Sequence, residues 1–281
     1  MNGTVTALGV LGTGASSYAT AVSNGGSVVV GGSQDNSSSP NEAQAFMWTG
    51  GVMSGLGFLP SCSSAPCRSA ATGVSADGSV VVGYAYYGSS NVYEAFRFTS
   101  NTMTGLGFMS GGSSSVAFGV SADGSVIVGQ ANTPNNTIAV EWVNGTLTSL
   151  GFLPGGNTSY AQGVSGDGSV VVGYSSHDFS GEDQAFRWTN GTMKGLGFLQ
   201  GGDQSYASAA NADGSVVVGY GLNNNRMYRT VRWTRSGGMR AIDDLLIAAG
   251  VNITDWQLNQ ATGVSADGTT IVGYGTDPNG N

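Results

Sequence analysis

The sequence predicts an all-β fold assembled from one repeated four-stranded sheet, and three observations lead to this class. Glycine supplies 48 of the 281 residues, which argues against long helices and for many tight turns. A phrase resembling Ser-Ala-Asp-Gly-Ser-Val-Val-Val-Gly recurs six times, with turns at 25–26, 77–78, 123–124, 167–168, 213–214 and 267–268. Counted between the second glycines of successive turns, the spacing is 44 to 54 residues. That spacing is typical of a β-propeller blade and too long for a solenoid coil.

Each repeat is interpreted as four strands, which we name a to d in chain order. In the second repeat, strand a covers 71–75 and strand b covers 80–82, and Asp77-Gly78 is expected to join them as a two-residue hairpin turn. Consecutive valines predict that both faces of strand b are buried. Strand c covers 94–98 and carries alternate aromatic residues. In the fourth repeat, Asn190-Gly191 is expected to turn the chain into strand d at 193–199.

The two ends of the chain carry parts of one further repeat. Residues 3–11 match strand d, whereas the C-terminal residues stop after strands a and b of the sixth copy. We therefore expect residues 1–281 to form a single propeller domain of six blades, the sixth split between the termini and incomplete. Because strand c of that blade is missing, the chain is interpreted as a monomeric domain of a longer protein.

One segment departs from the β pattern. Apolar residues at 242, 245, 246 and 249 follow the spacing of one helix face, and Gly250 is a suitable helix end. We therefore expect a short helical insertion near 241–250, and burial against the propeller edge explains it better than partner binding does.

Composition limits the function classes. Charged residues make up only 9% of the chain, and the formal net charge is −8. Binding to nucleic acids or to anionic membrane surfaces requires clustered Lys and Arg, which this sequence lacks. Its apolar runs are also far shorter than the roughly 20 residues needed to span a bilayer, so no membrane insertion is expected.

The only two cysteines, Cys62 and Cys67, lie in an enlarged d–a loop. No further Cys or nearby His is available to complete a zinc site. We therefore predict a disulfide, which indicates an oxidising compartment.

The repeat phrase, the x-Ala-Phe-x-Trp strand and Gly-Leu-Gly-Phe-Leu-Pro-Gly-Gly together resemble the bacterial HAF-type extracellular repeats over nearly the whole chain. The histidine of the His-Ala-Phe triplet is replaced in this sequence, which has Gln44, Glu94 and Gln184 before Ala-Phe. The resemblance implies an extracellular or surface protein of a Gram-negative bacterium, often a passenger attached to an autotransporter barrel. It implies no defined biochemical activity.

Catalysis is weakly indicated. The only histidine, His177, is interpreted as a solvated loop residue rather than part of a Ser-His-Asp triad. Asp178, Glu182 and Asp183 form an acidic cluster in the same loop, which leaves a polysaccharide hydrolase or lyase as an alternative. No catalytic residue, cofactor or metal site is assigned. A calcium ion held by this cluster, or by the turn residues Asp77, Asp123, Asp167, Asp213 and Asp267, is the weaker alternative to a structural role.

Tyrosines gather where the longer, divergent loops are expected, before strand a and after strand b. An aromatic ring face together with a hydroxyl suits sugar stacking, and covering the blade ends is a nearly equal explanation. The leading hypothesis is therefore an adhesion or glycan-binding module with a glycan or a surface protein as ligand, and a purely structural surface spacer is the third alternative. The candidate ligand-binding residues are Tyr18, Tyr84, Tyr160, Tyr174, Tyr206, Tyr220 and Tyr274.

Overall fold

The computed structural model describes residues 5–34, 43–62, 67–87, 92–178 and 181–280. The chain divides into two compact units, residues 1–127 and 128–281, and the division falls inside strand β10. Within the described ranges the regular structure is twenty-two strands, one 3-10 turn η1 (Asn24–Gly26) and one α-helix. The all-β class predicted from the sequence is therefore confirmed.

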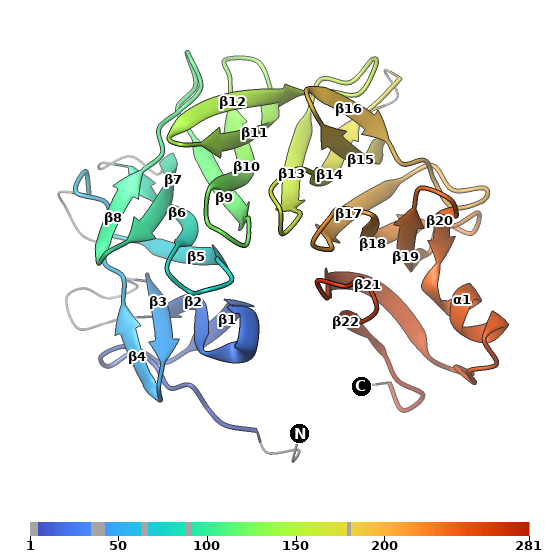
Figure 1. Cartoon of the computed structure of the whole chain (residues 1–281), viewed down its shortest axis with the longest axis horizontal. Helices are drawn as coiled ribbons and strands as arrows, with labels where there is room; N and C mark the ends of the chain where they lie inside the picture. The colour runs from blue at the N-terminus through green and yellow to red at the C-terminus, as the bar shows by residue number, and fades with distance from the viewer. Residues whose placement is uncertain (1–4, 35–42, 63–66, 88–91, 179–180, 281) are drawn as a thin grey trace. The chain divides into compact units, whose positions relative to one another are not determined.

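The strands form antiparallel sheets whose order follows the chain (Figure 1). The first unit contains two complete four-stranded sheets, β1 (Ser17–Val22), β2 (Val28–Gln34), β3 (Ala43–Thr49) and β4 (Val52–Gly55), then β5 (Ser69–Val74), β6 (Val81–Tyr87), β7 (Val92–Thr99) and β8 (Thr102–Gly105). The sheet at the division comprises β9 (Ser115–Val120), β10 (Val126–Asn132), β11 (Thr137–Val143) and β12 (Thr146–Gly151).

The second unit contains two more four-stranded sheets and one sheet for which two strands are described. The four-stranded sheets are β13 (Ser159–Val164), β14 (Val171–Ser176), β15 (Asp183–Thr189) and β16 (Thr192–Gly195), then β17 (Ser205–Ala210), β18 (Val216–Leu222), β19 (Tyr228–Thr234) and β20 (Gly238–Ala241). The remaining sheet pairs β21 (Gln257–Val264) with β22 (Ile271–Thr276).

The predicted helical insertion is confirmed. Helix α1 (Ile242–Ala248) directly follows β20 and precedes Gly250, which has a φ of +78° (Figure 1). Its expected burial is only partial, because none of its residues is fully buried and Ile247 remains 61% exposed.

Strand d of the fourth repeat, predicted at 193–199, ends earlier than expected. Strand β16 ends at Gly195, because the Leu196 N–H bonds back to the Ala185 carbonyl at 2.8 Å and Gly197 turns the chain with a φ of +78°. At the N-terminus, residues 3 and 4 of the expected 3–11 strand lie outside the described residues. Residues 5–11 are in no strand, so this part of the expectation differs from the structure.

The Asp-Gly turns differ from the predicted two-residue hairpins. Of the pair in the second repeat, only Gly78 has a positive φ, at +78°. The Asp77 carboxylate accepts hydrogen bonds from the Ser75 hydroxyl at 2.7 Å and the Ser79 N–H at 2.9 Å. Aspartate is therefore used for its side-chain acceptor rather than for left-handed backbone.

The predicted Asn-Gly turns between strands c and d have the expected form. Asn190 and Gly191 have φ values of +49° and +77°, which match the left-handed pair of a type I′ hairpin. Asn144 and Gly145 show the same conformation, at +52° and +78°.

A serine at the start of four a strands links each of these sheets to the preceding one. Its hydroxyl accepts a hydrogen bond from an alanine N–H of the preceding c strand. It also donates one to a glycine carbonyl at or just after the end of the preceding d strand, and this second distance is 2.7 Å in every case. We name this arrangement the serine bridge. The alanine–serine pairs are Ala45–Ser69, Ala95–Ser115, Ala139–Ser159 and Ala185–Ser205, and the accepting carbonyls belong to Gly57, Gly107, Gly151 and Gly197.

Valine side chains form the core between neighbouring sheets. Val172 is fully buried and packs in one cluster with Ala185 of the adjacent strand β15 and Val217 of β18 in the next sheet. The turn glycines complete this contact, because a methyl group added at Gly214 would lie 2.5 Å from the Cγ2 atom of Val170. Close packing between sheets therefore depends on a valine at one fixed position and on a turn residue without a side chain.

Candidate functional site

Two cross-strand tyrosine pairs lie in the second unit. Tyr160 of β13 is opposite Tyr174 of β14, and their ring centroids are 4.7 Å apart in a stacked arrangement. Tyr206 of β17 is opposite Tyr220 of β18, also stacked at 4.7 Å. Directly opposed positions in an antiparallel sheet bring side chains on one face together, and this register produces both pairs.

Edge-on contacts join these pairs into one row. The Tyr174 and Tyr206 centroids are 5.0 Å apart, and Tyr220 lies 5.5 Å from Tyr228 of β19. We call Tyr160, Tyr174, Tyr206, Tyr220 and Tyr228 the tyrosine row. It runs across two successive sheets, and Tyr228 at its end is 52% exposed.

Burial raises the pKa of two phenols in the row. Desolvation, followed by the charge of Tyr160, raises the pKa of Tyr174, and desolvation with the charge of Asp183 raises the pKa of Tyr206. Desolvation also raises the pKa of Asp183, although a hydrogen bond with Tyr206 lowers it in part. Tyr174 and Tyr206 therefore present neutral rings whose hydroxyls can donate and accept hydrogen bonds.

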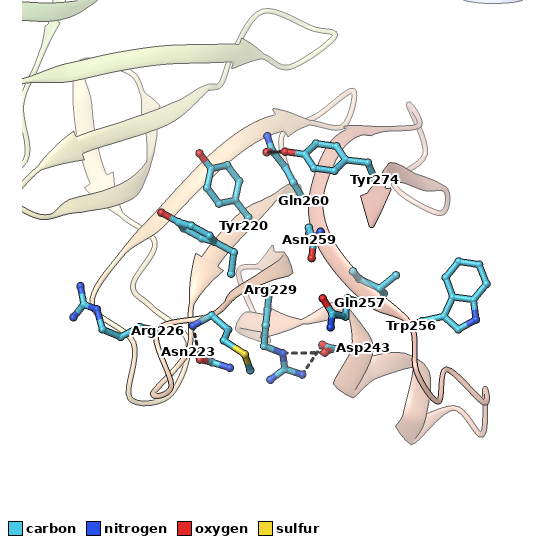
Figure 2. A pocket seen from close by; sticks show the side chains of 13 residues that line it. Tyr220, Asn223, Arg226, Arg229, Asp243, Trp256, Gln257, Asn259, Gln260 and Tyr274 are labelled. Carbon is cyan, nitrogen blue, oxygen red and sulfur yellow. Dashed lines mark hydrogen bonds and ion pairs between the residues drawn. The ribbon is translucent and has the colours of Figure 1, made fainter. Parts of the chain in front are cut away.

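A pocket of 870 Å³ lies at the Tyr228 end of the row (Figure 2). Gln260 and Tyr274 occupy one end of it, and Arg229 and Asp243 the other, as Figure 2 shows. The lining residues come from β18, β19, α1, β21, β22 and nearby loops. They are Tyr220, Asn223, Arg226, Met227, Tyr228, Arg229, Asp243, Trp256, Gln257, Leu258, Asn259, Gln260 and Tyr274.

Helix α1 supplies carboxylates that pair with Arg229, one of the two arginines that line this pocket. Arg229 Nε donates to Asp243 at 2.9 Å, and an Nη atom donates to Asp244 at 2.6 Å. Burial alone would lower the pKa of Arg229, but the hydrogen bonds to Asp244 and Asp243 outweigh it and the pKa is raised. The arginine is therefore a fixed, paired cation.

Four of the seven predicted binding residues, Tyr160, Tyr174, Tyr206 and Tyr220, form the row, and Tyr274 lines the pocket. All five lie within strands rather than in the loops where the sequence suggested them. Tyr274 is 60% exposed and donates to Gln260 Oε1 at 2.7 Å.

Tyr18 and Tyr84 belong to the first unit. Tyr84 packs edge-on against Tyr93, with centroids 5.2 Å apart, whereas Tyr18 is 57% exposed.

Sequence reasoning missed Tyr228, Trp256, Arg229 and Asp243. Tyr228 and Arg229 stand where the fourth repeat has Asp183 and Gln184, and Trp256 follows the helical insertion. These candidates could therefore have been found as positions at which the sequence differs from its own repeat.

The acidic loop is only partly described, since residues 179 and 180 lie outside the described ranges. His177 Nδ1 lies 3.0 Å from Asp178, and its ring packs on Phe198 with centroids 5.3 Å apart. Within the described parts of the chain, His, Cys, Asp and Glu side chains nowhere gather in a group of three that could hold a metal ion. Asp183 lies in β15 beside Tyr206, whose hydroxyl donates to Gln204 Oε1 at 3.1 Å.

The predicted Cys62–Cys67 disulfide is present. Cys67, directly before β5, is buried. In the part of the chain that the structure describes, none of the helices is long and apolar enough to cross a membrane.

Comparison with solved structures finds β-propeller proteins. TolB from Acinetobacter baumannii aligns with a TM-score of 0.53 and 12% identity over 77% of this chain and 52% of that one. An Agrobacterium tumefaciens protein assigned to TolB gives a TM-score of 0.54 and 13% identity, covering 79% and 78% of the two chains. Prolyl oligopeptidase B from Galerina marginata gives 0.51 and 8% identity over 89% of this chain and 37% of that one.

These likenesses support a β-propeller fold, and at such low identity they show the fold alone. The chain spans about half the length of the Acinetobacter protein. No protein-family model and no curated protein sequence matches the chain.

Proposed function

We propose that this chain is a non-enzymatic β-propeller module that binds a glycan along the tyrosine row. The stacked and edge-on contacts of the row carry this proposal, because they present several aromatic rings in sequence across two sheets. An oligosaccharide has apolar C–H faces that pack on such rings and hydroxyls that hydrogen bond to neutral phenols. A linear row suits an extended chain of sugar residues.

We further propose that the module acts outside the cytoplasm, on a bacterial surface. The Cys62–Cys67 disulfide supports an oxidising compartment. The resemblance to HAF-type repeats supports a surface protein. In this proposal each of the six sheets is one blade of the propeller.

The proposal is tested by screening the purified chain against an oligosaccharide array and measuring the affinity of the best ligand by calorimetry. Replacing Tyr174 or Tyr206 with Ala is expected to weaken binding about tenfold, since each loses one ring contact. Tyr86→Ala is the matched control, because this tyrosine of the first unit packs on Tyr93 and not on the row. Melting curves establish that each variant is folded.

Unchanged affinity in folded Tyr174→Ala and Tyr206→Ala variants would exclude the tyrosine row. If the chain binds surface proteins and no oligosaccharide, the ligand is a protein and the glycan proposal is wrong. Chromatography of the recovered oligosaccharide tests the enzymatic alternative, for which shortened products are expected and which Asp183→Asn should then abolish.

A further inference from the structure

We propose that the pocket at the Tyr228 end of the row is a subsite for an uncharged sugar residue, so that the module selects neutral over acidic glycans. This inference rests on the proposed function and specifies its ligand class. Three observations support it: the repeat pattern is interrupted at the pocket, the charged side chains around the pocket are paired, and the other lining groups are free to contact a ligand.

The pocket lies where the serine bridge is replaced. The strand register places Thr230 at the position of Ala185. Counted along the chain, Asn259 corresponds to Ser205, but the register shifts between Leu258 and Gln260 and leaves Asn259 without a partner in β22. Thr230 is only 6% exposed, and its hydroxyl has no hydrogen-bond partner. It lines a second cavity of 490 Å³, which shares Trp256, Leu258, Gln260 and Tyr274 with the larger pocket. Buried hydroxyls are normally paired, so this one indicates a polar group still to be bound.

The cations of the pocket are paired with carboxylates. Arg229 is bonded to both Asp243 and Asp244, and Arg226 donates to Asp203 at 2.9 Å. These five groups sum to one negative charge, and the whole chain carries a formal −8. An anionic ligand would have to displace a carboxylate from an arginine while approaching a negative surface, which is unfavourable.

The remaining lining groups are exposed aromatic faces and neutral polar side chains. Trp256 is 50% exposed, and Tyr274 is oriented by its hydrogen bond to Gln260. Amides of Asn223, Gln257 and Asn259 also line the pocket. Aromatic faces with amide donors and acceptors match a pyranose ring, whose faces are apolar and whose edge carries hydroxyls.

The test compares cellohexaose with hexagalacturonate, together with the best neutral and acidic hits of the array, by calorimetry and by quenching of tryptophan fluorescence. We expect neutral ligands to bind at least tenfold more tightly than acidic ligands of equal length. Trp256→Ala should weaken neutral binding about tenfold, because it removes one stacking face. Tyr86→Ala is again the control, and Thr230→Val tests the unpaired hydroxyl with little change in volume.

The outcomes separate this inference from the proposed function. Glycan binding that requires Tyr174 but is unchanged in folded Trp256→Ala would overturn the subsite alone. Tighter binding of acidic glycans, or of choline or a lysine peptide, would overturn the neutral ligand class. Absence of any glycan binding would overturn both proposals.

Discussion

The hydroxyl of Ser205 lies 2.9 Å from the backbone nitrogen of Ala185, and this hydrogen bond joins the first residue of β17 to the preceding sheet. The same hydroxyl donates to the Gly197 carbonyl at 2.7 Å, and Ser205 is fully buried. One side chain therefore satisfies a donor and an acceptor that the two sheets would otherwise leave unpaired.

Replacing Ser205 with Ala is expected to lower the free energy of unfolding by about 1–3 kcal/mol, because a buried N–H and a carbonyl lose their partner. Urea denaturation followed by circular dichroism measures this change. Ser110→Ala serves as the control, since Ser110 is exposed. Equal stability of the two variants would show that the bridge contributes nothing.

The turn glycines allow strain and packing to be separated. Gly107 and Gly214 both have a positive φ, of +77° and +65°, but only Gly214 contacts a valine of another sheet. Gly107→Ala should cost about 1–2 kcal/mol from left-handed backbone alone. Gly214→Ala should cost about 1–3 kcal/mol more, because the methyl group collides with Val170. Similar unfolding free energies for the two variants would contradict the close packing.

Acid should destabilise the chain through its turn aspartates. Hydrogen bonds from Ser75, Ser121 and Ser265, together with those from the residues two positions after each aspartate, lower the pKa of Asp77, Asp123 and Asp267 to about 2. Because these values lie below the usual value near 4, the unfolded chain binds protons first as the pH falls. The stabilisation that the ionised turn aspartates give to the folded chain is therefore present above about pH 4 and is lost as the pH falls toward 2.

Thermal unfolding between pH 6 and pH 2 measures this loss. A variant carrying Asp77→Asn, Asp123→Asn and Asp267→Asn should show a shallower decline, since an amide keeps the acceptor oxygen but does not titrate in this range. An equally steep decline in the variant would place the acid sensitivity elsewhere.

The disulfide makes a prediction for thiol chemistry. Unreduced, denatured protein should contain no free thiol, and reduction should release both cysteines of the chain. Reduction should also lower the free energy of unfolding by about 2 kcal/mol, the loop-entropy value for so short a loop. The Cys62→Ser, Cys67→Ser double variant should match the reduced protein, and a stability equal to that of the oxidised protein would contradict the estimate.

The sequence was most informative where it is periodic. Val172, Asn190 and Gly191 recur at fixed positions, and their burial or turn conformation follows from residue type alone. The short helix could be predicted because its apolar spacing differs from the strands around it. Cys62 and Cys67 had no other partner in the chain, so their pairing was also predictable.

The remaining features depend on contacts between distant residues. The bridge made by Ser205 could not be predicted, because nothing local indicates that its hydroxyl reaches a residue twenty positions earlier in the chain. The Asp77-Gly78 turn was predictable as a turn, but the residue types did not show that only Gly78 takes a positive φ while the Asp77 carboxylate accepts from Ser75 and Ser79. Arg229 replaces a glutamine of the repeat and Asp243 belongs to the helical insertion, so only the folded chain shows that they meet.

The serine bridges also bear on how the protein opens. Each bridge connects a sheet only to its neighbour along the chain, so local opening free energies depend on the links at each junction. At the junction of Thr230 and Asn259 the bridge is replaced, and the amide protons of β21 and β22 should therefore exchange with solvent before those of β13 to β18. A ligand in the pocket contacts residues on both sides of this junction, and its arrival would slow that exchange and merge the last two strands into the same cooperative unit as their neighbours.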